Sequence, residues 1–354
     1  MNDISMPAQV REDFRFTGRG GEYFRIWIVN LLLSVVTLGI YSAWAKVRRE
    51  QYFHRHTVFG GTSLDYHGRP SSILKGRLLV VGLLAVYQGL AVALPVAAAL
   101  LFLVSLVLWP WIMRQSLRFR AHNTSWRGIR LHFDGTLGEV ARIFYLHGLA
   151  VPLSLGLAYP WWKRNLQRFA LGRMRFGQTP FTANPSASDY YLAYLIPGAI
   201  MFVIGLLLVA GLGIAISVFQ ISWPTSQAST DGVPILMSLM IAVVYLMMML
   251  LGPAISRALT TNALFNAAKV GPHRFVSTMR PLPLMGIILS NALLTLVTLG
   301  FYMPFAKVRL ARYRAQCTAL IVDGSLDEFL AEEALDVRAL GDEAADFLDV
   351  DIGF

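Results

Sequence analysis

Basic side chains grouped directly after apolar stretches are the residues of this sequence best suited to chemistry. Each of three such clusters could bind the phosphate of a lipid or an anionic solute. The clusters could equally anchor the chain at a membrane surface, because each Lys or Arg near an anionic leaflet contributes about 1 kcal/mol. The candidate residues are Lys46, Arg48, Arg49, Lys163, Arg164, Arg168, Lys307, Arg309 and Arg312.

A second group of polar side chains lies inside apolar stretches, where a hydrogen-bonding group needs a partner or a function. Asparagine and threonine near helix-breaking glycine or proline are typical of transport folds, whose binding sites form at broken helices. For His147 the sequence leaves two interpretations open, a hydrogen bond between helices and a proton relay. These intramembrane polar positions are Asn30, Thr37, Tyr41, His147, Asn291, Thr298 and Tyr302.

Motifs for enzyme chemistry are absent from the sequence. It contains no Walker A loop, no GxSxG nucleophile elbow, no HExxH zinc motif and no dinucleotide fingerprint. No Asp or Glu lies well inside an apolar stretch, so carboxylate-based proton or sodium coupling has no candidate. We therefore predict no catalytic residue, no metal site and no cofactor, and we rank an enzyme below the non-enzymatic classes.

The composition is that of a membrane protein. Of the 354 residues, 55% are hydrophobic and only 15% are charged, which leaves too little polar surface for a soluble globule. A membrane helix needs roughly 20 apolar residues. Uncharged runs of that length cover 78–113, which is enough for two crossings, and 190–221 and 233–256; three further apolar stretches with glycine, proline or other polar breakers cover about 24–45, 143–162 and 284–306.

The distribution of Lys and Arg favours one topology, since basic residues beside membrane helices stay in the cytoplasm. The loop 221–232 has no Lys or Arg and is expected outside. We predict an α-helical polytopic membrane protein with internal repeats, built of four full transmembrane helices in two hairpins plus three broken or re-entrant apolar segments. Both termini are then cytoplasmic. The alternative is seven full spans, which would place basic turns outside.

One module recurs along the chain. The stretch "TLGIYSAWAKVRREQY" at 37–52 returns as "TLGFYMPFAKVRLARY" at 298–313, and a fainter copy includes Arg257. Alternating segments between glycines, such as "GGTSLDYHG" and "RGIRLHFDG", follow basic turns and predict short cytoplasmic β-segments. The pieces "DFRFTG" and "HRFVS" are expected to add edges, so that several such segments form a small cytoplasmic β-assembly under the helices.

These stretches resemble the YjgN family of bacterial inner-membrane proteins, a domain of unknown function. The resemblance covers about residues 13–330 and is carried by "FRFTGRGGEYFRIWIVNLLLSVVTLGIYSAWAKVRREQY", "FGGTSLDYHG" and "NALLTLVTLGFYMPFAKVRLARY". It implies a multi-pass protein of the bacterial inner membrane, and it carries over no activity or site residue.

The acidic residues gather at one end of the sequence. The whole chain has a net charge of +10, yet from Asp323 onward it holds eleven acids and one Arg. Ser325 and Glu328 have the spacing of a capping box before Phe329 and Leu330, which is typical of a short acidic helix. Such a helix would fold back on the basic body, but the interpretation that we favour is a solvated, disordered end. We divide the chain into a cytoplasmic N-terminal segment with a short strand (1–22), a repeated membrane domain (23–330) and an acidic C-terminal tail (331–354).

Two functions fit these observations. The first is a transporter or channel for a small or lipidic anion, and the alternative is a non-enzymatic lipid-binding or envelope-organising membrane protein. A transporter needs Asn30 and Asn291 in a common hydrated cavity, whereas a lipid binder needs its arginines in a groove open to the leaflet. The expected partners are anionic membrane lipids and, through the acidic tail, the chain's own basic face. A homo-oligomer is left open, and nucleic acid is excluded because the charge lies in short blocks.

Overall fold

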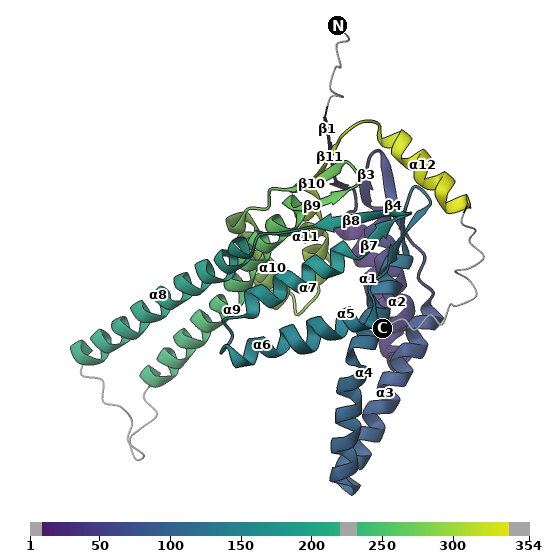
Figure 1. Cartoon of the computed structure of the whole chain (residues 1–354). Helices are drawn as coiled ribbons and strands as arrows, with labels where there is room; N and C mark the ends of the chain where they lie inside the picture. Colours follow the sequence, from purple (N-terminus) through teal and green to yellow (C-terminus); the bar gives the residue numbers. More distant parts are fainter. Residues whose placement is uncertain (1–8, 220–231, 340–354) are drawn as a thin grey trace.

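An antiparallel sheet is the centre of the protein. The computed structural model describes residues 9–219 and 232–339, within which eleven short strands pair in the order β1-β11-β10-β9-β8-β7-β6-β5-β4-β3-β2 (Figure 1). The strands are β1 (Val10–Asp13), β2 (Arg15–Phe16), β3 (Thr57–Phe59), β4 (Thr62–Tyr66), β5 (Thr124–Trp126), β6 (Ile129–Phe133), β7 (Met174–Phe176), β8 (Thr179–Ala183), β9 (Ala268–Val270), β10 (His273–Ser277) and β11 (Thr318–Val322).

The sheet curls round and nearly closes, because its two edge strands are halves of one bent segment. Only Phe14 separates β1 from β2. The first half pairs with β11 and the second half pairs with β3. At the bend, the Phe14 N–H donates to the Thr318 carbonyl over 3.1 Å. The result is a barrel-like sheet.

Tight turns join the strands in pairs at one end of the sheet, which we call the turn end. In two hairpins both turn residues have positive φ, namely Gly60 with Gly61 and Arg127 with Gly128. The other two turns begin with Gly177 and Gly271, also at positive φ. These mirror-image turns match the twist of antiparallel strands, and they explain why glycine recurs at this end.

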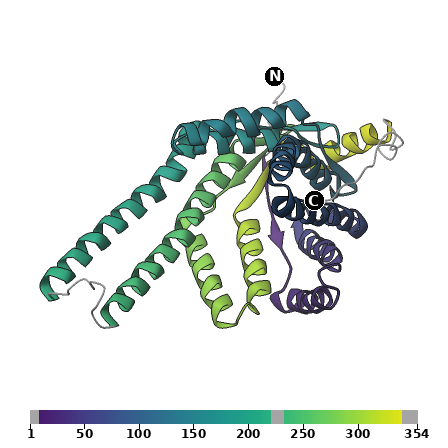
Figure 2. The same cartoon turned by 90° about the horizontal axis from the view of Figure 1, so that it is seen from below.

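Helical hairpins connect the strand pairs at the opposite end. Each helix pair packs against the next, and α11 packs against α1, so the helices form a ring as the strands do (Figure 2). The shorter hairpins are α1 (Gly20–Val36) with α2 (Ser42–Arg55), α5 (Leu137–Ala141), the π-helix η1 (Arg142–His147) and α6 (Gly148–Leu153) with α7 (Tyr159–Gly172), and α10 (Pro281–Val297) with α11 (Met303–Gln316); the longer ones are α3 (Pro70–Ala93) with α4 (Pro95–His122) and α8 (Ala187–Phe219) with α9 (Gly232–Asn266).

The same turn reverses the chain in all three shorter hairpins. A leucine in the left-handed region ends the first helix, with φ of 49° at Leu38, 52° at Leu155 and 50° at Leu299, and a glycine at φ of 91° to 95° follows. In each case the glycine N–H donates to a carbonyl five residues back over 2.7–2.8 Å, as in a Schellman motif. The three leucines are 95%, 95% and 89% exposed, so each hairpin has an apolar tip.

Three helices among the described residues are long and apolar enough to cross a membrane. They are Pro70–Ala93, Pro95–His122 and Ala187–Leu208, and no more than 11% of the most apolar window of each is buried. Such helices need lipid around them, which supports a membrane protein. The loop predicted to lie outside, 221–232, falls outside the described residues except for its last position.

The predicted fold class is wrong. The sequence indicated four full transmembrane helices in two hairpins plus three broken or re-entrant segments, or alternatively seven full spans, with β-segments as accessories. The described chain instead has three candidate spans and one eleven-stranded sheet. Strands do occur in the segments whose alternation predicted them, including Thr62–Tyr66, Ile129–Phe133 and His273–Ser277. The sequence indicated a small assembly of such segments but not one sheet that joins all eleven strands, because strands of two to five residues give no signal of distant pairing.

A last helix, α12 (Leu326–Ala339), lies across the turn end of the sheet (Figure 1). Its first turn is capped by Ser325, whose hydroxyl accepts from the Glu328 N–H over 3.3 Å. The capping-box spacing thus indicated a helix, and the favoured interpretation of a disordered end is wrong for residues 326–339. The predicted boundary at residue 331 falls inside this helix, and residues 340–354 of the predicted tail lie outside the described part of the chain.

We expect Gly300→Ala to destabilise the protein by about 1–2 kcal/mol, because a Cβ is strained at a φ of +95°. Nothing lies within 4 Å of that Cβ, so backbone strain is the only cost. Gly286→Ala within α10 is the matched control; its Cβ also meets nothing, and alanine favours the helix by roughly 0.5–1 kcal/mol. Thermal unfolding in detergent followed by circular dichroism measures both variants, and equal midpoints would contradict the argument.

Candidate anion-binding site

A groove between α7, α8 and α9 is lined by two basic side chains and is therefore the candidate anion-binding site. It encloses about 680 Å³. α7 contributes Tyr159, Lys163 and Gln167; α8 contributes Tyr194, Pro197, Gly198 and Met201; and α9 contributes Gly252, Pro253, Ser256, Arg257, Thr260 and Thr261.

Helical periodicity sorts the lining residues into layers. Positions four apart share one helix face, and both α7 and α9 run toward the sheet while α8 runs away from it. The layer farthest from the sheet therefore holds Tyr159, Met201 and the Gly252–Pro253 pair. The middle layer holds the cations and Ser256, and the layer nearest the sheet holds hydroxyl and amide groups. The groove thus changes from mainly apolar to basic to polar along its length.

Proline and glycine open the space between α8 and α9. Pro197 and Pro253 both lie inside their helices, where proline has no N–H to donate and bends the helix. Each is followed or preceded by a lining glycine, Gly198 or Gly252, and a Cβ added at either would meet nothing within 4 Å. Part of the groove wall is therefore bare backbone.

The middle layer carries positive charge that no described carboxylate neutralises. Lys163 is half-buried and Arg257 is exposed, and neither forms an ion pair within the part of the chain that the structure describes. Arg314 of α11 lies close by; burial, followed by the charge of Arg257, lowers the pKa of Arg314 to about 10. Positive charge this poorly compensated favours a bound anion.

A second basic cluster lies where α2 and α11 approach each other. The pKa of Lys46 is lowered by burial and by the charges of Arg77, Arg120 and Arg49, whereas the charge of Glu50 opposes this shift. Burial and the charge of Arg49 likewise lower the pKa of Lys307. The structure therefore brings together members of two predicted clusters, Lys46 and Arg49 from the first and Lys307 from the third. Glu50 pairs with Arg49 over 2.7 Å.

The other predicted basic residues mainly brace the fold. Arg48 lies over the Tyr41 ring, 5.8 Å from its centroid, and Arg168 is exposed on α7. The remaining three guanidinium groups donate to oxygen atoms on neighbouring segments: Arg164 to the Pro185 carbonyl (2.6 Å), Arg309 to the Ser290 hydroxyl (2.7 Å) and Arg312 to the Gly18 carbonyl (3.0 Å).

The predicted intramembrane polar residues belong to the helical hairpins. Asn30 and Asn291 are 7% and 9% exposed, and the Asn291 amide donates to the Ala306 carbonyl over 3.3 Å, joining α10 to α11. The hydroxyls of Thr37 and Thr298 accept from the Tyr41 and Tyr302 N–H groups at the tip turns. Tyr41 stacks on Trp44, Tyr302 stacks on Phe305, and His147 packs against Trp161 at 4.6 Å.

The sequence interpretation missed most of the groove. Arg257 fits the repeated pattern and could have been added to the candidates on that basis. The hydroxyl groups of Ser256, Thr260 and Tyr194 gave no signal, because their role depends on how α8 packs against its neighbours. Arg77 and Arg120, which both lie at the sheet end of the long hairpin α3–α4, were also left out of the candidate site.

Comparison with known proteins identifies relatives in the bacterial inner membrane. The chain is 26% identical over 160 residues to inner membrane protein YjgN of Escherichia coli K12, which is 45% of this chain and 39% of that protein. It is 28% identical over 176 residues to inner membrane protein YjgN of Salmonella typhimurium LT2, which is 49% of this chain and 44% of that protein. The matches thus span about two fifths of the length of these curated relatives, and no solved structure matches.

The relatives' names and the apolar helices together support an inner-membrane location. A model of the family described as "bacterial protein of unknown function (DUF898)" matches residues 11–347, nearly the whole chain. The predicted resemblance to the YjgN family is therefore confirmed, and the chain belongs to this DUF898 family of bacterial membrane proteins.

Proposed function

We propose that this inner-membrane protein binds a lipidic anion, with a phosphate-bearing headgroup in the groove between α7, α8 and α9. The proposal rests on one observation: Lys163 and Arg257 line the same open cavity, and no carboxylate of the described chain forms an ion pair with either of them. Charge-assisted hydrogen bonds from Lys and Arg to phosphate are about twice as strong as neutral ones. The groove therefore has the donors that a headgroup needs.

The layered lining supports a lipid rather than a free ion. A headgroup at Lys163 and Arg257 would lie between hydroxyl donors on the sheet side and an apolar wall on the other side. That apolar wall includes Met201 and belongs to the candidate span Ala187–Leu208. An acyl chain attached to the phosphate could follow this wall into the bilayer, where its burial is favourable.

The asparagines favour lipid binding over transport. A transport path would need Asn30 and Asn291 in one hydrated cavity, yet Asn291 lines a mostly apolar groove on α10 that does not include Asn30, and its amide donates to a backbone carbonyl. The cations of the groove, in contrast, remain accessible. We therefore place the lipid-binding function ahead of the transporter.

We also propose that the sheet faces the cytoplasm and that the chain is built from repeats of one module. Basic residues flank the sheet side of the helices, as the positive-inside rule requires. Both β1 and α12 lie on the sheet, which supports placing both described ends on that side (Figure 1). The same leucine–glycine turn at three tips, with φ values agreeing within about 5°, supports repetition.

The double variant Lys163→Gln/Arg257→Gln is expected to weaken binding to anionic lipid at least about tenfold, because two charge-assisted contacts are lost. The assay is native mass spectrometry of purified protein titrated with phosphatidylglycerol, with phosphatidylcholine for comparison. The control is Lys75→Gln/Arg25→Gln, which removes the same charge from exposed positions on α3 and α1. If both double variants lose the same amount of lipid binding, the loss depends only on overall charge, and the proposed site is refuted.

Gly198→Leu is expected to block the groove without changing its charge, because the leucine side chain would enter the open space beside Gly198. Lipid binding should fall by a similar factor. Gly205→Leu on the same helix serves as the control, since its side chain also enters open space but does not line the groove. Free inorganic phosphate is titrated in parallel. If the protein binds phosphate and shows no preference for the lipid, the ligand of the groove is a small anion and not a lipid.

A further inference from the structure

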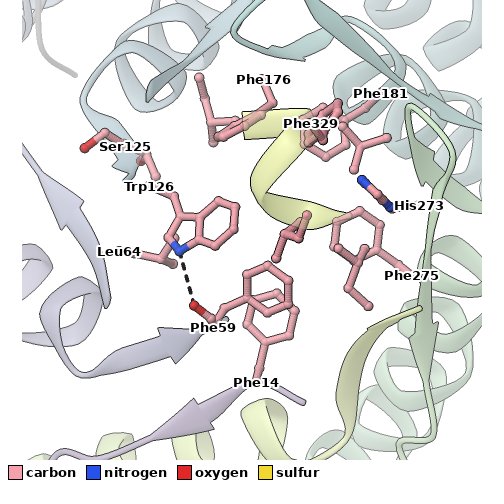
Figure 3. A pocket seen from close by; sticks show the side chains of 15 residues that line it. Phe14, Phe59, Leu64, Ser125, Trp126, Phe176, Phe181, His273, Phe275 and Phe329 are labelled. Atoms are coloured by element: carbon pink, nitrogen blue, oxygen red, sulfur yellow. Dashed lines mark hydrogen bonds between the residues drawn. The ribbon is translucent and has the colours of Figure 1, made fainter. Parts of the chain in front are cut away.

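The inside of the curled sheet holds an apolar cavity that is separate from the basic groove. It encloses about 140 Å³ and is lined mainly by aromatic rings (Figure 3). The rings come from strands all round the sheet, including Phe59 of β3, Trp126 of β5, Phe176 of β7 and Phe275 of β10. An apolar cavity of this size stays dry and can take up a molecule the size of benzene.

One polar side chain among these rings lacks a partner. His273 lines the cavity and is only 1% exposed (Figure 3). Its Nδ1 accepts from the Asp323 N–H over 3.2 Å, and its Nε2 is buried with no hydrogen-bond partner in the described chain. Burial lowers the pKa of His273, so the ring is neutral. Since Nδ1 is an acceptor, the single proton lies on Nε2, which is therefore a buried donor without an acceptor.

We propose that this cavity binds a small aromatic molecule of about one ring that carries an oxygen acceptor for the His273 Nε2–H. The aromatic walls offer stacked and edge-on contacts to such a ring. Its carbonyl or hydroxyl oxygen would satisfy the buried donor, whose lack of a partner is unfavourable in a dry site. A hydrocarbon of the same shape would make the contacts with the aromatic walls but could not accept a hydrogen bond from the His273 Nε2–H.

The helix α12 closes this site at the turn end of the sheet. Leu326 and Phe329 complete the lining, and the Phe329 ring meets His273 edge-on at 4.9 Å. The buried Glu333 carboxylate accepts from the Gln178 N–H over 2.6 Å and from the Thr179 hydroxyl, both at the β7–β8 turn. A Cβ at Gly177 would collide with this carboxylate. A ligand that leaves at the turn end must therefore displace α12.

The test compares two fluorinated probes of nearly equal shape, 4-fluoroacetophenone and 4-fluoro-α-methylstyrene, in which a CH₂ group replaces the carbonyl oxygen, by ¹⁹F NMR on the full chain in detergent. Wild-type protein should bind the ketone about tenfold more tightly than the hydrocarbon, which is the scale of one neutral hydrogen bond in a dry site. His273→Phe should abolish this preference, and His273→Gln, which keeps an N–H donor, should restore part of it.

A cavity-filling variant separates binding in the sheet from partition into micelles. Leu131→Trp should remove the bound signal of both probes, whereas Leu282→Trp adds the same ring at an exposed position of α10 and should not. If Leu131→Trp fails to fold by circular dichroism, Leu64→Phe fills the same cavity with a smaller ring. Equal probe signals in wild type and the filled variant, or a ketone preference that survives in His273→Phe, would overturn the proposal.

Discussion

Backbone pairing of the bent segment 10–16 with β11 on one side and β3 on the other is the interaction on which the rest of the structure depends. Each hairpin alone has strands of three to five residues and would be marginal in water. Joined in a ring, the β-hairpins share an aromatic interior and direct the helical hairpins away from the turn end. That arrangement fixes where the basic helix ends meet and leaves the turn end for α12.

Local chemistry in the sequence predicts several elements of this ring but not the ring itself. The alternation in β4 and β6 is regular, and both are preceded by glycine turns, so these strands can be read directly. β7 and β8 cannot, because Pro180 interrupts the second and the first has three residues. The pairing of β1 with β11 joins segments about 300 residues apart, and a pattern of four or five residues carries no information about so distant a partner. Counting apolar length also predicted more spans than the three candidates found among the described residues.

The candidate site was predictable where charge stands out and unpredictable where packing decides. Lys163 was identified from its basic cluster, and Arg257 can be identified from the fainter copy of the repeated module. The sequence gives Arg164, Arg309 and Arg312 the same weight as Lys163, since nothing local reveals that their guanidinium groups donate to oxygen atoms on neighbouring segments. The His273 donor was equally hidden, because the cavity around it is assembled from strands spread over most of the chain.

The position of β11 gives the protein a demanding order of assembly. The ribosome adds about 5–20 residues per second, so the roughly 300 residues between β1 and β11 take on the order of 15–60 s to synthesise. Throughout that time the early strands have unpaired edges, which are prone to join strands of other chains. The apolar helices α3, α4 and α8 emerge before β11 and need lipid at once. The bilayer therefore holds the unfinished sheet in place. Membrane insertion protects the solvent-facing sheet from aggregation until β11, its last strand, has been synthesised.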